Sequence, residues 1–130
     1  MKILIYGRQL SQVEPISELL ESFDDIELYE LVVEDKNEGT ISDIIDCVGA
    51  GKNGIEGVVF VGICPPEELM SAIKAGIEIL LLFTCFDSVI TMKKIQIGQA
   101  TSPFDENLNN ELDNFVFRIK EKTKTKLIAL

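Results

Sequence analysis

Few residues of this 130-residue chain could do acid-base, nucleophilic or metal chemistry, and histidine is absent. A Ser-His-Asp or Cys-His nucleophile pair, a phosphohistidine carrier and any His-containing metal site are therefore excluded. The three cysteines, Cys47, Cys64 and Cys85, show no CxxC spacing, which is typical of thiols in a reducing cytoplasm. A redox pair of Cys64 with Cys85, or a thiol nucleophile, is an alternative, although no histidine is present to activate the thiol. We expect no enzymatic activity.

The charge of the chain is unevenly distributed along its length. The formal net charge of -10 argues against a nucleic-acid surface, because phosphate contacts depend on lysine and arginine. Residues 118–130 hold five basic residues and one acidic residue, whereas residues 1–117 hold 7 basic and 21 acidic residues. We interpret residues 123–130 as a basic tail that frays in solvent. Docking of its lysines on an acidic partner, and a short oligomer contact through residues 127–130, are the alternatives.

No segment of the chain looks like a targeting or membrane-spanning sequence. The apolar run at residues 3–6 is too short for the core of a signal peptide. No later run approaches the length of a membrane span. We therefore expect a cytoplasmic protein without membrane partners.

Apolar strand-like runs alternate with helical patterns, which is typical of a parallel sheet covered by helices on both faces. The expected strands are residues 2–6, 26–33, 58–61, 77–83 and 95–100. The expected first helix extends through Phe23, with Pro15 in its first turn because proline cannot donate a hydrogen bond further in. Thr40 and Asp43 resemble a capping box that opens the second helix, and Pro66 suits the first position of the third. The last two helices are expected at residues 87–94 and 104–122.

Apolar residues at helical spacing predict the buried faces of these helices. The first helix has Ile16, Leu19, Leu20 and Phe23 at this spacing. The second would bury Ile41, Ile44, Ile45 and Val48 and end at Gly49 and Gly51; the third would bury Leu69, Met70 and Ile73. The last would bury Phe104, Leu108, Leu112, Phe115 and Ile119.

The composition of the strands predicts their order in the sheet. The first, third and fourth runs are almost continuously apolar, as expected of central strands, whereas the second and fifth alternate as edge strands do. The order 2-1-3-4-5 satisfies this and predicts one doubly wound, flavodoxin-like α/β domain of three layers over residues 1–122. In such folds ligands bind at the carboxyl ends of the strands. The residues that matter then follow each strand: Gly7 and Arg8, Glu34 and Asp35, residues 62–66, residues 84–87 and residues 101–103.

Four segments at these strand ends carry a family resemblance: KILIYGR, VVFVGICPP, LLLFTCFDS and ATSPFDENL. Through them the chain resembles a response-regulator receiver domain from Lys2 to about Lys122. In receivers an acidic pair after the first strand and an aspartate after the third hold Mg²⁺ while that aspartate takes a phosphoryl group. The resemblance places Gly7 and Arg8 at the acidic pair and Gly62 at the phosphoacceptor. It also places Ser102 at the conserved lysine and Gln99 at the aromatic switch position, while Thr84 is retained.

The resemblance implies a degenerate receiver, or pseudo-receiver, without a metal, a cofactor or phosphoryl transfer. Such a module would act in signal transduction as an adaptor or regulator through protein contacts. Receivers bind partners through the face of the fourth helix, fifth strand and fifth helix. Here that face would consist of Met92, Lys93, Gln96, Asn109, Asn110 and Asp113, and it would hold a protein partner or a second copy.

A Rossmann-like domain that binds a small molecule is the alternative function. Arg8, Thr84 and Ser102, together with nearby helix amino ends, could receive a phosphate, a nucleotide or CoA. The segment at residues 58–84 is similar to the CoA-binding domain of acyl-CoA synthetases, but GRQLSQ has a single glycine where that domain has a glycine-rich turn. Arg8 itself is most simply a surface arginine.

Overall fold

The computed structural model describes residues 1–33, 39–51, 53–82, 98–100 and 108–128, the backbone alone for residues 98–100 and 123–128. The strands are β1 (Lys2–Gly7), β2 (Glu27–Val32), β3 (Ile55–Val61), β4 (Glu78–Leu82) and β5 (Gly98–Ala100). The helices are α1 (Leu10–Glu21), α2 (Ile41–Val48), α3 (Pro66–Lys74) and α5 (Leu108–Ile128).

The strands form a parallel sheet whose main body has the order β2-β1-β3-β4. β1 lies between β2 and β3, with Gly7 opposite Val32 on one side and Val61 on the other. The short strand β5 pairs with β4 from Leu80↔Gly98 to Leu82↔Ala100. The expected α/β class and the parallel 2-1-3-4 order are confirmed.

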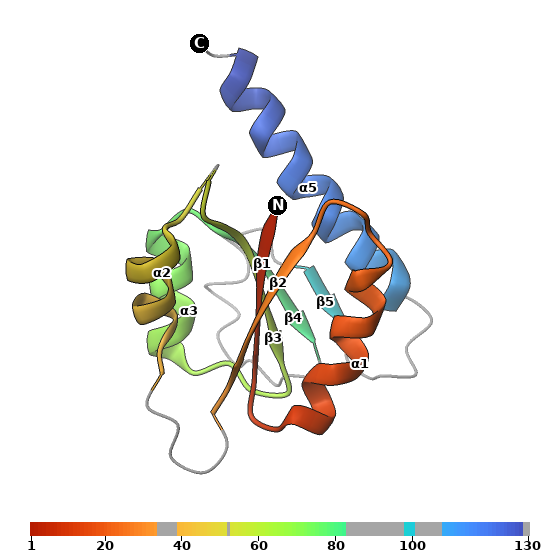
Figure 1. Cartoon of the computed structure of the whole chain (residues 1–130), viewed down its shortest axis with the longest axis vertical. Helices are drawn as coiled ribbons and strands as arrows, with labels where there is room; N and C mark the ends of the chain where they lie inside the picture. The colour runs from red at the N-terminus through yellow and green to blue at the C-terminus, as the bar shows by residue number, and fades with distance from the viewer. Residues whose placement is uncertain (34–38, 52, 83–97, 101–107, 129–130) are drawn as a thin grey trace.

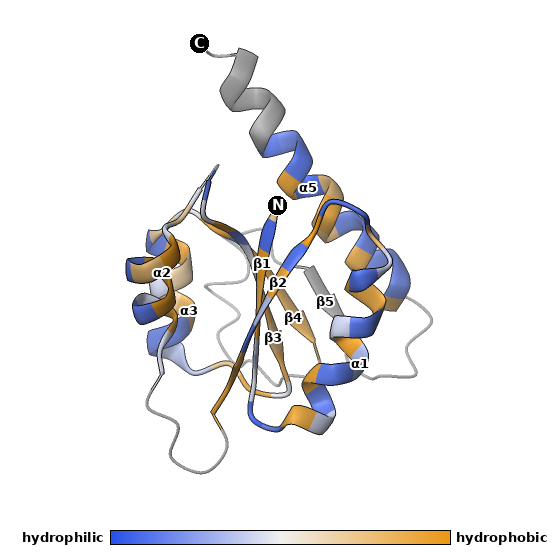
Figure 2. Cartoon of the chain, viewed as in Figure 1, coloured by the Kyte–Doolittle hydropathy of each residue, from blue (hydrophilic) through white to orange (hydrophobic). Residues whose placement is uncertain are grey.

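Helices cover both faces of the sheet, with α2 and α3 on one side and α1 and α5 on the other (Figure 1). Successive side chains of a strand point to opposite faces. In β1, Ile3 and Ile5 accordingly join the core under α1 and α5, whereas Leu4 and Tyr6 join the core under α2 and α3. Hydrophobic residues dominate β3 and β4, and the helices have mixed polar and hydrophobic sides (Figure 2).

The burial of the strands confirms which of them are central. β3 and β4 are buried almost throughout, because both of their faces are covered. In β2 only Leu31 is fully buried, as expected of an edge strand.

Helix α1 differs from its prediction, because Pro15 lies in the helix interior and not in the first turn. The helix begins at Leu10, and its first turns are fixed by Val13, which is fully buried against the sheet. Burial of Val13 thus outweighs the hydrogen bond that Pro15 cannot donate. Leu19 is 36% exposed, whereas Ile16 and Leu20 are buried.

The predicted starts of α2 and α3 are confirmed. Thr40 and Asp43 form the reciprocal capping box, and Gly49 ends α2 with a φ of 88°. α3 begins at Pro66. The prediction that Met70 faces inward is wrong: its side chain is 47% exposed, and Ala72 is buried instead.

Helix α5 packs on the sheet through Leu108, Leu112, Phe115 and Ile119, as expected. Gly57 allows the close approach, since a Cβ there would lie 2.6 Å from Phe115 Cζ and 2.7 Å from Ile119 Cδ1. The helix continues to Ile128 and not to residue 122, because residues 108–128 contain neither glycine nor proline. The expected tail at residues 123–130 is therefore helical over most of its length. The helix expected at residues 87–94, residues 95–97 of the last expected strand and Phe104 lie outside the described residues.

Candidate functional site

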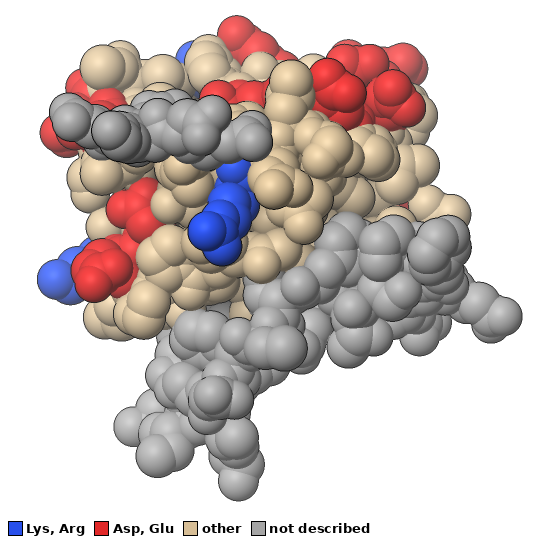
Figure 3. Space-filling view, turned by 90° about the horizontal axis from the view of Figure 1, so that it is seen from below, with Lys and Arg blue, Asp and Glu red and all other residues tan. Residues whose placement is uncertain are grey.

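The carboxyl edge of the sheet, where the sequence places the site, is the edge seen in Figure 3. β1 and β3 are parallel neighbours, and Gly7 pairs with Val61. Gly7 and Arg8 therefore lie beside Gly62, which directly follows β3. Thr84 and Ser102, the other members of the predicted site, lie outside the described residues.

Gly7 closes the end of β1 against the first turn of α1. Its backbone oxygen accepts a hydrogen bond of 3.0 Å from Val33 N, beyond the end of β2. A Cβ on Gly7 would lie 2.4 Å from Val13 Cγ2. No larger residue fits while Val13 stays buried, so an acidic side chain at position 7 would displace α1.

Gly62 adopts a left-handed backbone conformation with a φ of 77°. Its N–H donates a hydrogen bond of 2.8 Å to Leu82 O, which ties the end of β3 to β4. A Cβ here would lie 2.9 Å from Gln12 Oε1 and 3.0 Å from Gln12 Nε2. The carboxamide of Gln12, from α1, thus lies over the position that the resemblance assigns to the phosphoacceptor. No sequence pattern points to Gln12, because its contact with Gly62 is tertiary.

Arg8 is exposed and, within the described ranges, is the one Lys or Arg directly after a strand. On the described part of this edge, basic side chains are few and uncharged side chains are the most common (Figure 3). The exposed guanidinium of Arg8 is accessible to an anion or to an acidic partner.

Two ionisable side chains, those of Tyr6 and Cys64, lie beneath this edge on the side of α2 and α3. Burial raises the pKa of Tyr6 to about 12, and the neighbouring charge of Glu68 adds to the effect. Burial also raises the pKa of the Cys64 thiol to about 12. Cys64 is therefore a protonated thiol at neutral pH, which argues against the thiol-nucleophile alternative. Cys47 is exposed on α2, and Cys85 lies outside the described residues.

Glu68 connects the two helices on this side of the sheet. Its carboxylate, on α3, accepts a hydrogen bond of 2.8 Å from Ile41 N in the first turn of α2. Anions are favoured at helix amino ends, where backbone N–H groups lack partners within the helix. Sequence analysis missed Glu68, because it acts on a residue 27 positions away.

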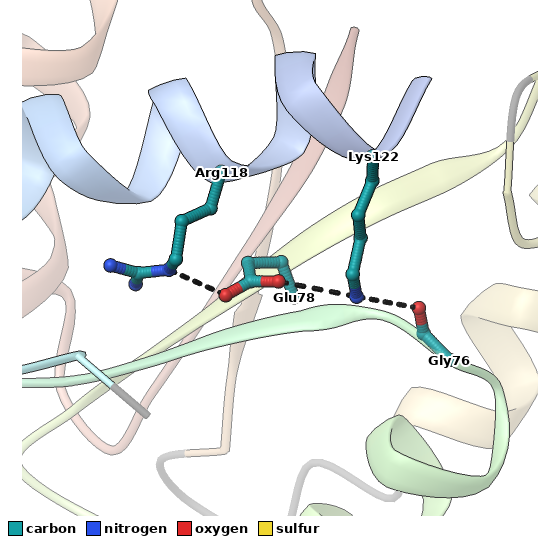
Figure 4. A network of polar contacts seen from close by, with 4 residues as sticks. All are labelled: Gly76, Glu78, Arg118 and Lys122. Atoms are coloured by element: carbon teal, nitrogen blue, oxygen red, sulfur yellow. Dashed lines mark hydrogen bonds and ion pairs between the residues drawn. The ribbon is translucent and has the colours of Figure 1, made fainter. Parts of the chain in front are cut away.

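A cluster of ion pairs joins α5 to the start of β4 (Figure 4). Glu78 is buried and contacts Arg118 Nε at 2.6 Å and Lys122 Nζ at 3.2 Å. Lys122 also donates to Gly76 O at 3.3 Å, and Arg118 Nη2 is buried without a hydrogen-bond partner. This cluster lies at the amino edge, opposite the predicted site, and it anchors α5.

The amino edge also carries a small polar hollow of about 280 Å³. It is lined by Met1, Lys2, Glu27, Asn53, Gly54 and Glu56. Lys2 Nζ donates a hydrogen bond of 3.2 Å to Asn53 O. Sequence reasoning did not single out these residues, because they flank strand starts and not strand ends.

The predicted partner face is described only for α5, because Met92, Lys93 and Gln96 lie outside the described residues. Asn109, Asn110 and Asp113 are exposed on α5. Phe117, four residues after Asp113, is 60% exposed. Residues three and four apart share one side of a helix, so Asn110, Asp113 and Phe117 form one stripe away from the core. Phe117 is an addition to the predicted face.

The part of the chain that the structure describes contains no cluster of three or more Cys, Asp or Glu residues arranged to hold a metal ion. None of its helices combines the length and the apolar character needed to cross a membrane. Comparisons of the chain with protein-family models, with curated proteins and with solved structures found no match.

Proposed function

We propose that this chain is a receiver-like regulatory module, with five strand-helix units in a flavodoxin-like arrangement, that acts through protein contacts and transfers no phosphoryl group. The parallel order β2-β1-β3-β4, with helices on both faces of the sheet, supports this architecture. In this proposal β5 and α5 belong to the fifth unit.

The observation that carries the proposal is the group of residues at the ends of β1 and β3. By the resemblance, Gly7, Arg8 and Gly62 take the positions of a receiver's carboxylates, and Gln12 lies over Gly62. Mg²⁺ requires carboxylate or similar oxygen ligands, and the positive charge of Arg8 repels a cation. A glycine at position 62 offers no oxygen nucleophile for a phosphoryl group. Binding is then the function left to this edge and to the helix faces.

The exposed stripe of α5 supports a role in protein contacts. Phe117 is an aromatic side chain exposed among polar neighbours, and aromatic anchors of this kind dominate the energetics of protein interfaces. Asn110 and Asp113 add polar groups at the rim of the same stripe. The partner is expected to bind across this stripe.

Incubation with acetyl phosphate and Mg²⁺ tests the absence of phosphoryl transfer. Intact-mass spectrometry should show no added phosphoryl group, and beryllofluoride with Mg²⁺ should leave the amide NMR spectrum unchanged. A stable adduct on any aspartate, or shifts clustered around Gly62, would refute the proposal.

Co-purification from the native host tests the role in protein contacts. A partner that the wild-type chain retains should be lost with Phe117→Ser, while the control Leu10→Ser, at another exposed apolar residue, should retain it. Equal recovery with both variants would show that the α5 stripe does not carry the interaction.

A binding site for a small phosphate-bearing molecule is the second candidate function, and the start of α1 favours it. Gln9, the residue before α1, makes no side-chain cap, and the amides of Gln12 and Val13 donate to its backbone oxygen. The amides of Leu10 and Ser11, which precede them, are the ones that an anion could bind. Arg8 is exposed one residue earlier. Phosphate, nucleotides or acyl-CoA should then raise the melting temperature of the wild-type chain but not of Arg8→Ala. An equal response to unrelated anions would exclude this function.

A further inference from the structure

The carboxyl-terminal part of α5 extends beyond the body of the fold. Ile119 is the last residue of α5 that belongs to the described core, and the helix continues to Ile128. At 1.5 Å per residue, residues 120–128 add about 13 Å of helix, along which Lys122 still contacts Glu78 and Gly76 at the amino edge. Figure 1 shows this end of α5 projecting past the amino edge of the sheet.

The projecting segment is basic and is a poor helix former on its own. Lys120 is exposed, and the sequence adds Lys124 and Lys126 on the same helix. Thr123 and Thr125 have low helix propensity, and short helices without tertiary packing are marginal in water. A helical end of this composition is stabilised when it docks on another surface.

Helix α1 carries the opposite charge at the same end of the molecule. Glu14, Glu18 and Glu21 are exposed and follow one another at spacings of four and three residues, which places them along one stripe. Asp24 and Asp25 continue the acidic surface beyond the helix, and α1 has no basic residue in its last turn. Carboxylates repel one another at this spacing, and they are unfavourable near the carboxyl end of a helix.

The carboxylates of this acidic surface have no ion-pair partner within the described part of the chain, where both ion pairs involve Glu78. The amino-terminal ammonium of Met1 reaches only the backbone oxygen of Asp25. Binding of a basic helix would relieve the repulsion along α1.

We propose that a second copy of this chain docks at this edge, with the projecting end of α5 of each copy lying against the acidic end of α1 of the other. α1 and α5 cover the same face of the sheet, and the carboxyl ends of both helices lie at its amino edge (Figure 1). One two-fold axis at this edge therefore satisfies both contacts, which makes the interface isologous. This inference goes beyond the proposed function and does not depend on it, since it uses a different part of α5 from the Phe117 stripe.

Charge complementarity favours a second copy over other acidic partners. Residues 1–117 hold 21 acidic and 7 basic residues, so the body of the molecule is repelled by an anionic membrane or by nucleic acid. A second copy carries its α1 carboxylates and its basic α5 end at the same edge. In the dimer the carboxylates of each copy therefore meet the lysines of the other.

Sedimentation analysis of the full chain tests the proposal. At about 20 mM salt the wild-type chain should dimerise, and at about 500 mM salt, where screening is strong, the dimer dissociation constant should rise at least tenfold. The variant Lys120→Glu with Lys124→Glu should be monomeric at low salt, and so should Glu18→Lys with Glu21→Lys. A mixture of these two variants should form a heterodimer, because the exchanged charges again complement each other.

The matched control for the α1 variant is Asp46→Lys with Glu67→Lys, which makes the same change of net charge as Glu18→Lys with Glu21→Lys at exposed positions on the other face of the sheet. It should dimerise like the wild-type chain, and circular dichroism should show that all variants are folded. A monomeric wild-type chain at low salt would overturn the proposal. So would a dimer that both charge-exchange variants retain, or a mixture of the two that stays monomeric. Binding of the chain to anionic lipid vesicles, lost with the α5 variant, would assign the helix end to a membrane instead.

Discussion

Glu68 on α3 accepts a hydrogen bond from the backbone N–H of Ile41, so that α3 caps the start of the preceding helix, α2. Both residues are buried, with 8% of Glu68 and none of Ile41 exposed. The first turns of α2 and α3 thus meet through this buried contact beneath the candidate site. The contact ties the orientation of α2 to that of α3.

Glu68→Ala should lower the free energy of unfolding by about 1–3 kcal/mol, because it leaves a buried N–H without an acceptor. Glu68→Gln keeps an acceptor oxygen and should lose less. Urea denaturation measures both, and Glu67→Ala, at an exposed position of the same turn, is the control. An equal loss for Glu67→Ala would show that the effect is one of helix propensity and not of the cap.

Arg118 and Lys122 should contribute unequally to the anchoring of α5 on Glu78. The side chain of Arg118 is 21% exposed and that of Lys122 is 51% exposed, so water screens the second pair more strongly. We expect Arg118→Met to cost about 1–3 kcal/mol and Lys122→Met at most about 1 kcal/mol. Thermal unfolding with Lys120→Met as the reference measures both. Losses of equal size would contradict this ranking.

Gly62→Ala should destabilise the fold by about 1–2 kcal/mol, because residues with a Cβ disfavour a left-handed backbone conformation. Part of the loss should come from the collision with Gln12. Gln12→Ala alone should have little effect on stability. Combined with Gly62→Ala, it should restore the part of the stability that the collision costs, and a double-mutant cycle measures this coupling. Additive losses would show that Gln12 moves away freely.

Cys64 should react slowly with iodoacetamide in the native state at pH 8, because burial raises the pKa of its thiol to about 12. The exposed Cys47 should react at the rate of an ordinary thiol. Peptide mapping after timed alkylation distinguishes the two, and both should react equally in urea. Rapid native alkylation of Cys64 would restore the thiol-nucleophile hypothesis.

Stability should fall as the pH rises above about 9, and Cys64 should cause part of the fall. Its pKa is raised from 9.0 in the unfolded chain to about 12 in the native state. Between these values the unfolded chain loses its proton first, so the unfolded state binds fewer protons and deprotonation favours it. Cys64→Ala should flatten the dependence of unfolding free energy on pH between 9 and 11 relative to Cys47→Ala. Identical slopes for the two variants would refute this.

Local patterns predicted the features whose causes are local. The apolar runs of β1, β3 and β4 follow from burial on both faces, and Thr40, Asp43 and Pro66 form or begin their helices through contacts within a few residues. The inner face of α5 follows in the same way from its helical period. These features persist in the fold because tertiary packing agrees with them.

Features set by tertiary contacts could not be predicted. Pro15 lies inside α1 because Val13 is buried against the sheet, and Met70 is exposed because Ala72 is the residue that meets the core. At the candidate site, Gly7 and Gly62 were predicted from their places after strands. The positions of Gln12 and Glu68 depend instead on how α1 and α3 pack, which no local pattern records.

The close fit of Gly57 beneath Phe115 and Ile119 bears on how the protein is made. Strands β1 to β4 are synthesised before α5, which covers one side of the sheet and comes later in the chain. Until then the valines and leucines of β3 and β4 on that side remain open to water. The nascent chain therefore exposes an apolar surface that chaperones can bind until residues 108–119 emerge from the exit tunnel. Translation that stalls earlier leaves a product prone to aggregate.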